Sequence, residues 1–533
     1  MKNIFKVFRN YIEFIIFIIL KKILGLFVLG LFILTACEDD PEPVTPVFDA
    51  PSITAPGVSS VEANSAIDVT FTVSSPGGYA SSAWTFTGGS AAPKSEPDAG
   101  ATSGNVVATF TAGAEAGAAS LTLTVTDAQG KSSSQTAVID VTAEPIVVTP
   151  DPVQHTGVIE ADETWTSDRF HILNNKVYVA EGVTLTIEAG TIIKGSPGTG
   201  SLASALVVAM GGKINAVGTA SSPIIFTSTS DNIELGSTSG TNLTTDDSGL
   251  WGGLIVLGKA KISASDDDGI DVVSAQIEGI PADVPYGSYG GSDDADNSGT
   301  LSYISIRHGG SLLGEGNEIN GLTLGGVGSG TSISYVEVVA NKDDGIEFFG
   351  GSVDCSYCMT AFHDDDGIDI DQSYSGSITN SVSLQGPGSD HALEIDGPEG
   401  SMEAGYTLDG ITLIGNGGTA KSEIADFRKS ALGANKNVYA YNFPPAGDGD
   451  ISLSSGSDAT YAAGTLSFES WEIALNAADS DVLNIMPDIS GTRTMINNPS
   501  GSAAVTVVTA GSQTVGATLA GFDWTWSKAN GLY

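Results

Sequence analysis

A stretch near the middle of the chain repeats itself. Residues 335–347 read YVEVVANKDDGIE and residues 357–369 read YCMTAFHDDDGID, an offset of 22 residues. A related acidic stretch, DHALE, returns 25 residues further on, at 390–394. A repeat of this length is typical of a solenoid, in which each coil buries its apolar side against its neighbours. The sequence therefore predicts stacked coils, with side chains that are distant along the chain lying above one another.

The region from about residue 157 to residue 533 consists of short β runs with glycine at the corners and no long helical period. Coils of 22–25 residues suit three short strands and three corners. Alternation along the strands predicts two inward-facing columns of apolar side chains, made by Ile346, Ile368 and Leu393 and by Phe348, Ile370 and Ile395. Burial of such columns, about 1.5–3 kcal/mol per fully buried aliphatic side chain, would hold the solenoid together.

Two stretches carry a family resemblance. LTIEAGTIIKG at 185–195 and ALVVAMGGKINAVGTASSPIIFTS at 205–228 resemble the N-terminal coils of right-handed parallel β-helices of the pectin-lyase-like class. ISYVEVVANKDDGIEFFGG at 333–351 resembles a family of bacterial, Bacteroidetes-type surface lipoproteins. The resemblance implies a β-helix over 157–533, and the less repetitive segment at about 450–533 is expected to cap it, with Trp524 and Trp526 as packing residues. This fold hosts many activities, so the resemblance says little about function.

Residues 51–143 alternate apolar and polar side chains in short runs, which predicts an antiparallel β-sandwich with Trp84 in its core. LTLTVTDAQGK at 121–131, followed by AVIDV at 137–141, resembles the last hairpin of PKD-like immunoglobulin-type domains. A proline- and acid-rich tether at 37–50 precedes this domain, and a linker at 144–156 follows it. The predicted fold class is therefore all-β: an immunoglobulin-like sandwich followed by a right-handed parallel β-helix.

The N-terminus has the features of a lipoprotein signal peptide over residues 1–36. Lys21 and Lys22 precede a short apolar run, and LTAC at 34–37 resembles the bacterial lipobox, which implies acylation, including palmitate, on Cys37. The alternative, an uncleaved anchor over 11–36, is weakened because the lysine pair splits the apolar stretch into pieces too short to span a bilayer. The extra apolar stretch at 11–20 leaves a translation start at position 20 open.

Glu38, Asp39 and Asp40 follow the cysteine and resemble the acidic export tag of Bacteroidetes surface lipoproteins, which implies the outer membrane and the cell surface. Retention facing the periplasm is the alternative. Without the first 36 residues the formal charge changes from −42 to −46. Such a chain is repelled by phosphate backbones and by anionic lipid headgroups, so we expect no nucleic-acid partner and a membrane anchorage that rests on acyl chains.

The repeats place carboxylates in columns on the outward side of one strand. Glu347, Asp369 and Glu394 form one column, Asp371 and Asp396 belong to the next, and the corner residues Asp343, Asp365 and Asp390 form a third near His363. Two carboxylates one coil apart, about 4.8 Å, repel by roughly 3.5 kcal/mol at an effective dielectric of 20. The columns indicate either a solvated acidic stripe or a Ca²⁺ site. The candidate ligands are Glu347, Asp365, Asp369, Asp371, Glu394 and Asp396.

Two further features concern a loop and a cysteine pair. Asp266–Asp268 and Asp293, Asp294 and Asp296 lie in a glycine-rich insertion at 262–300, which we expect to be a solvated loop or a loop ordered by Ca²⁺. Cys355 and Cys358 align with the core positions Ile333 and Val336, so we expect two small core side chains rather than a local disulfide bond.

Two functions follow from these features. The first is a surface protein that binds polysaccharide or partner proteins without catalysis. The second is a Ca²⁺-dependent uronate lyase, which the fold resemblance implies: the acids would hold the ion, and Arg428, in register with Asp396, would remove the proton. Arg428 is also explained as a structural ion pair with Asp396, and we expect the non-catalytic function.

Overall fold

The computed structural model describes residues 46–143, 150–266, 268–312, 319–418, 422–479, 481–486 and 504–533, with the backbone alone at Ser201. The predicted signal peptide, Cys37, most of the tether and residues 144–149 of the linker lie outside these ranges. The chain divides into two units between residues 147 and 148. Each unit is described by itself. Among the described residues, no helix combines the length and the apolar character needed to cross a bilayer.

The first unit consists of two four-stranded sheets whose inner faces share one core. Along most of the longer strands buried residues alternate with more exposed ones, as predicted, and Phe71, Phe110 and Leu121 are fully buried. Trp84 is half-buried and packs edge-on against Phe71, with ring centroids 5.7 Å apart. The two sheets are β1 (Ser52–Thr54), β3 (Ala66–Ser74), β6 (Ser103–Ala112) and β5 (Gly89–Ser95), and β2 (Ser59–Glu62), β8 (Ser132–Thr142), β7 (Gly117–Asp127) and β4 (Tyr79–Thr87).

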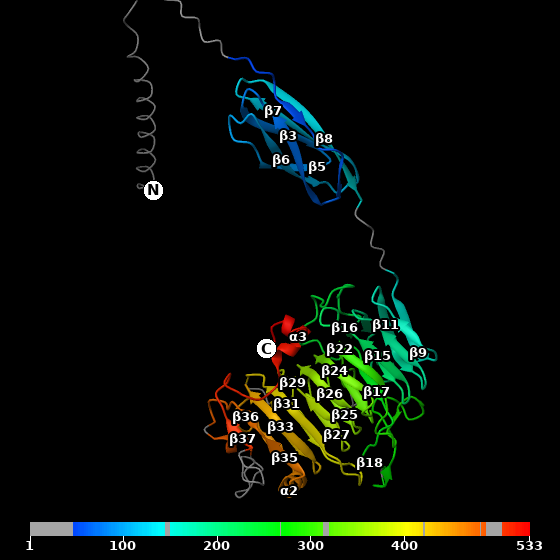
Figure 1. Ribbon diagram of the computed structural model, residues 1–533. Coiled ribbons are helices and arrows are strands. Elements are labelled where there is room, and N and C mark those ends of the chain that lie inside the picture. The colour runs from blue at the N-terminus through cyan, green and yellow to red at the C-terminus, as the bar shows by residue number, and fades with distance from the viewer. Residues whose placement is uncertain are drawn as a thin grey trace, which may run out of the picture. The chain divides into compact units, whose positions relative to one another are not determined.

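The second unit is a β-helix, in which all strand pairs of one large sheet are parallel and each strand pairs with strands of the coils above and below (Figure 1). The pairings form three stacks. The first contains β11 (Phe170–Val179), β14 (Ala205–Val208), β17 (Leu254–Leu257), β23 (Leu322–Gly325), β25 (Ile346–Phe349), β27 (Ile368–Asp371), β30 (Leu393–Asp396), β32 (Ala425–Arg428) and β34 (Ile451–Leu453).

The other two stacks share their long strands. The second stack contains β10 (Glu163–Trp165), β12 (Thr184–Ile187), β15 (Lys213–Val217), β22 (Gly299–Arg307), β24 (Ser332–Val339), β26 (Asp354–Ala361), β28 (Ser377–Thr379), β31 (Tyr406–Ile414), β33 (Gly433–Tyr441) and β35 (Leu466–Glu469). The third contains β9 (Val153–Ile159), β13 (Ile192–Gly195), β16 (Ile224–Ser228), β29 (Val382–Leu384), β36 (Trp471–Ile473) and β37 (Val505–Val507), with parts of β11, β22, β24, β26, β31 and β33.

The strands β22, β24 and β26 bend where they pass from the second stack to the third. The bends lie at Tyr303, Tyr335 and Tyr357, whose φ angles of 51°, 54° and 54° fall in the left-handed region that non-glycine residues rarely adopt. The three rings stack with centroids 4.4 Å and 4.6 Å apart, so aromatic stacking accompanies each strained bend.

The predicted register is confirmed. Ile346 pairs with Ile368 and Ile368 with Leu393, while Phe348, Ile370 and Ile395 form the second inward column. All six side chains are buried in one continuous core. The 22-residue offset therefore corresponds to one coil of the solenoid.

The insertion predicted at 262–300 packs on the first stack. It contains the short strands β18 (Ala264–Ser265), β19 (Asp271–Val272), β20 (Ala275–Gln276) and β21 (Ser288–Tyr289). Tyr289 is buried against Phe349, and its hydroxyl donates a hydrogen bond to Gln372 Oε1 at 3.1 Å. An apolar cluster thus attaches the insertion to the solenoid, which the expectation of a solvated loop did not foresee. Asp267 lies outside the described residues.

The segment expected to be a C-terminal cap has two parts. β34 to β37 continue the parallel pairing, accompanied by α2 (Ser455–Ala463) and the 3-10 turn η2 (Val482–Ile485). The last residues, with η3 (Leu519–Phe522) and α3 (Trp526–Ala529), return along the side of the solenoid (Figure 1). The amides of Trp526 and Ser527 donate to the buried Glu337 carboxylate at 3.0 and 2.8 Å, and Trp526 Nε1 donates to Ser239 Oγ at 3.1 Å. Trp526 is therefore a packing residue on the flank of the solenoid.

Candidate functional site

The predicted acidic column is present on the first stack. Glu347, Asp369, Glu394 and Asp426 occupy equivalent positions of β25, β27, β30 and β32, because each pairs with the next in register. Their neighbours two residues on include Asp371, on β27, and Asp396, which pairs with Arg428. The alternation of the strands turns these side chains away from the apolar core.

Apart from the half-buried Asp426, the column is buried, which argues against a solvated stripe. Glu347 and Asp369 are each 7% exposed, Glu394 is 8% exposed and Asp396 is 3% exposed. The insertion accounts for part of this cover, because Tyr289 packs on Phe349, and the charge of Glu278 acts on Glu347. Buried carboxylates lose their hydration and need a cation, a proton or hydrogen bonds in its place.

Glu347 and Asp369 form a cluster with Asp344. One carboxylate oxygen of each lies within 4.8 Å of the other two, and all three residues are buried. Burial and then the charges of neighbouring carboxylates raise the pKa of each carboxyl well above its usual range, although the charge of Arg428 offsets part of this at Asp369. Among the described residues, no lysine, arginine or histidine forms an ion pair with Asp344, Glu347 or Asp369. We call these three residues the uncompensated cluster.

Two asparagines line the uncompensated cluster. Asn341 Nδ2 donates to the carbonyl oxygens of Ile319 at 3.2 Å and Asp344 at 2.8 Å, and Asn320 Nδ2 donates to Glu347. The amide oxygens of both asparagines are buried without a hydrogen-bond partner, and so is Asp369 Oδ1. These three atoms without a hydrogen-bond partner are all oxygens, and oxygen is the ligand atom that Ca²⁺ prefers. The residues present therefore fit the calcium ion that the sequence suggested.

The neighbouring carboxylates are neutralised by the protein itself. Arg428 forms two hydrogen bonds to Asp396, at 2.8 and 3.2 Å, and an ion pair with Glu394. Lys429 Nζ lies 2.7 Å from Asp396 and 3.6 Å from Glu399. Glu394 and Asp396 are therefore partners of protein cations, and their assignment as metal ligands stays a prediction.

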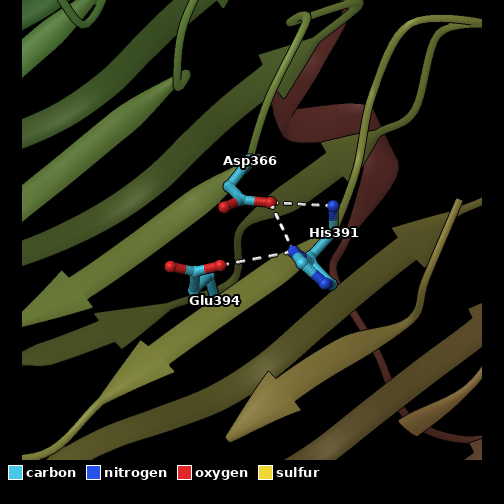
Figure 2. Close-up of side chains that lie close together, drawn as sticks. All are labelled: Asp366, His391 and Glu394. Atoms are coloured by element: carbon cyan, nitrogen blue, oxygen red, sulfur yellow. Dashed lines mark hydrogen bonds and ion pairs between the residues drawn. The ribbon is translucent and has the colours of Figure 1, made fainter. Parts of the chain in front are cut away.

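His391 supplies another internal cation (Figure 2). Its backbone amide donates to Asp366 Oδ1 at 2.8 Å, and its ring Nδ1 donates to the same oxygen at 2.8 Å and lies 3.4 Å from Glu394 Oε2. Nε2 lies 3.6 Å from Glu423. Burial alone would lower the pKa of His391, but the hydrogen bond and charge of Asp366, with the charges of Asp390 and Glu423, raise it to about 9. His391 is therefore a buried imidazolium at neutral pH.

The remaining predicted residues lie around these two groups. Asp365 is exposed and clusters with Asp343 and Asp344 rather than with Asp369. Asp371 faces Asp396, and burial and then this charge raise its pKa to about 7. The ring of His363 is buried, and its Nδ1 donates to the carbonyl oxygen of Asp365 at 2.9 Å.

Sequence reasoning missed one column of the site. The second residue of each corner pair, at Asp344, Asp366 and His391, lies at the inner edge of the acidic face, and Glu423 continues this column through a bridge to His391. The sequence did contain a sign of this column. In each of the two DDG motifs both aspartates repeat with the same offset of 22 residues, so the second aspartates must stack as the first ones do. Asn320, Asn341 and Lys429 had no such signal.

The cysteine expectation was wrong. Cys355 and Cys358 are joined by a disulfide bond, and both are fully buried in the solenoid core. Their alignment with Ile333 and Val336 is confirmed. The register was correct, and the bond forms because the two core positions bring their side chains together within one strand.

We predict that the metal-free protein loses stability as pH rises from about 6.5 to about 8. His391 keeps its proton in the folded state up to a pKa of about 9, whereas a histidine of the unfolded chain releases it near 6.5, so this stabilisation decreases over the range. Asp371, whose pKa burial raises to about 7, acts in the same direction. Below about pH 6.5 the buried His155, His171 and His363, whose pKa burial lowers to about 4, act in the opposite direction. Urea unfolding of dialysed protein at about pH 6.5 and about pH 8 tests this. A free energy of unfolding that rises with pH would contradict it.

A comparison with protein families agrees with this fold. Residues 157–527 match the family described as pectate-lyase like beta helix domain. No curated protein shows significant similarity to the chain.

Two solved structures are similar at low identity. An exopolygalacturonase of family 28 from Yersinia enterocolitica shares 10% identity over 80% of this chain and 92% of its own, with a TM-score of 0.20. A mutant of the SrpA adhesin from Streptococcus sanguinis shares 17% identity over 19% of this chain and 61% of its own, with a TM-score of 0.16. The match over residues 157–527 shows that this chain belongs to the pectate-lyase-like β-helix family.

Proposed function

We propose that this protein is a lipid-anchored, outer-membrane protein of the cell surface whose β-helix binds polysaccharide or a partner protein without catalysis. The lipobox at Cys37 supports the anchorage and the acidic residues after it support the surface location, although both lie outside the described residues. The proline-bearing segments on either side of the sandwich suit a spacer that holds the solenoid away from the membrane.

One observation carries the non-catalytic function. A lyase needs a base that is free to take a proton from its substrate. Arg428 is held by Asp396 and Glu394, and Lys429 is held by Asp396 and Glu399. Among the residues that the structure describes, these two basic side chains beside the acidic column are therefore committed to internal ion pairs, as the structural interpretation of Arg428 expected.

We further propose that Ca²⁺ binds the uncompensated cluster through Asp344, Glu347 and Asp369. The ion would supply the positive charge that the rest of the column receives from Arg428, Lys429 and His391. Because the three ligands come from two successive coils, the bound ion would link these coils. The chain's own carboxylates and amide oxygens would hold it, and its role here is structural.

We predict that acidic and neutral polysaccharides yield no unsaturated uronate products with this protein. The panel is incubated with purified full chain in Ca²⁺ and in EDTA, and the product double bond is followed by ultraviolet absorbance, while co-sedimentation measures binding. Binding without product supports the proposal. A Ca²⁺-dependent product that disappears in Arg428→Ala but persists in Lys528→Ala, a change on the distant α3, would establish the lyase instead.

A further inference from the structure

The first coil of the β-helix contains a cluster of two histidines and a tryptophan that is separate from the acidic column. His155 lies on β9, Trp165 on β10 and His171 on β11. The ring centroids lie 4.2 Å apart for His155 and Trp165 and 5.1 Å apart for Trp165 and His171. Both histidines are nine-tenths buried or more, with exposed fractions of 7% and 3%.

The hydrogen bonds of this cluster fix where its protons are. His171 Nε2 lies 3.1 Å from the carbonyl oxygen of Thr166, which can only accept, so Nε2 carries the proton and Nδ1 of the neutral ring is an acceptor. His155 Nε2, 2.9 Å from that Nδ1, must then be the donor. The remaining nitrogen, His155 Nδ1, is therefore left with a bare lone pair.

This lone pair faces another acceptor. Glu163 Oε1 lies 3.7 Å from His155 Nδ1, and the same oxygen accepts the indole N–H of Trp165 at 3.1 Å. No proton of a neutral cluster lies between the nitrogen and the carboxylate. Burial supports the neutral state, because it lowers the pKa of both histidines to about 4. A nitrogen lone pair and an anionic oxygen that face each other in this way can both bind one positively charged ion placed between them.

The two acceptors line an open pocket. Its volume is about 490 Å³, and Glu160 and Asp162 contribute further carboxylates to its wall. Tetrahedral zinc with Zn–N and Zn–O bonds of about 2.1 Å separates its nitrogen and oxygen ligands by roughly 3.4 Å, close to the separation seen here. Imidazole with carboxylate suits zinc-like ions, whereas Ca²⁺ prefers oxygen alone.

We propose that His155 Nδ1 and Glu163 Oε1 bind a zinc-class divalent ion at the N-terminal coil. The pocket leaves the remaining coordination positions to water, to the pocket carboxylates or to an external ligand. This site differs in donor chemistry from the uncompensated cluster, which offers oxygen alone. Neither site depends on the other, so the chain would hold two metals of different classes.

The test is equilibrium dialysis of the full chain against Zn²⁺ in the presence of excess Ca²⁺, which occupies the oxygen-only sites. Wild type is compared with Glu163→Gln, which keeps an acceptor for Trp165 but removes the charge, and with the control Glu188→Gln, an exposed glutamate of the next coil. We expect Glu163→Gln to bind one zinc fewer than wild type and than Glu188→Gln. Equal stoichiometry in all three proteins would overturn the proposal.

A second measurement identifies the ligand nitrogen. The chain has five histidines, so selective ¹⁵N labelling of histidine gives a simple spectrum. Zn²⁺ is expected to shift the Nδ1 resonance of His155 and to leave that of His308 unchanged. A His155 ring that is already doubly protonated at neutral pH without metal would show that a proton occupies the position, and the zinc site would be rejected.

Discussion

Asp369→Asn will stabilise the metal-free protein and abolish its stabilisation by Ca²⁺. The substitution removes one of three buried carboxylates whose oxygens lie within 4.8 Å of one another, so it relieves repulsion when no ion is present. We expect the free energy of unfolding to rise by about 1–3 kcal/mol in EDTA at alkaline pH. This is less than the roughly 3.5 kcal/mol of repulsion in a single charge pair at this distance, because burying the amide that replaces the carboxylate also costs hydration. Wild type should gain about 2.7 kcal/mol when free Ca²⁺ is roughly 100 times the Kd, and the variant should gain far less.

Urea unfolding in EDTA and in Ca²⁺ measures both effects. Asp354→Asn is the matched control, because Asp354 is exposed on β26 and accepts a hydrogen bond from the Ser377 amide at 2.9 Å, away from the cluster. The control should respond to Ca²⁺ as wild type does. If Asp369→Asn instead lowers stability in EDTA, the cluster is already compensated without metal and the account of its charge is wrong.

Asp396→Asn will destabilise the protein by about 2–3 kcal/mol, in EDTA and in Ca²⁺ alike. Asp396 is 3% exposed and pairs with both Arg428 and Lys429, so its removal leaves Arg428 with Glu394 alone and Lys429 with Glu399 alone. The expected loss is smaller than for a fully buried pair, because the Arg428 and Lys429 side chains are 39% and 50% exposed. In EDTA, Asp369→Asn would thus raise the free energy of unfolding and Asp396→Asn would lower it, although both residues lie on the same acidic face.

A double-mutant cycle with Arg428→Gln isolates the ion pair. The two substitutions share a contact, so their effects should be non-additive, with a coupling of about 1 kcal/mol or more. Additive effects, or a loss for Asp396→Asn that disappears when Ca²⁺ is removed, would return Asp396 to the set of metal ligands.

The backbone of the solenoid was predictable because register follows from the repeat. Ile346, Ile368 and Leu393 had to face the core, and this fixed Glu347, Asp369 and Glu394 on the other side of the strands. The stacking of carboxylates was therefore a consequence of the apolar pattern. The same logic placed Cys355 and Cys358 at core positions.

Which carboxylates of the acidic face pair with protein cations and which form the uncompensated cluster was not predictable, because this depends on contacts between residues distant along the chain. Tyr289 covers Phe349, two residues beyond Glu347, from an insertion that is rich in glycine and acidic residues. Lys429 follows β32 in a left-handed backbone conformation, with a φ of 45°. No pattern in the sequence predicted this conformation. Neutralised and uncompensated carboxylates therefore look alike in the sequence.

The most direct test is a crystal structure of the full chain grown in Ca²⁺, with anomalous data to identify the ion. The account predicts one calcium peak bound by carboxylate oxygens of Asp344, Glu347 and Asp369, and none between Glu394, Asp396 and Arg428. A cluster that stays empty in saturating Ca²⁺, or an ion that displaces Arg428 from Asp396, would contradict it.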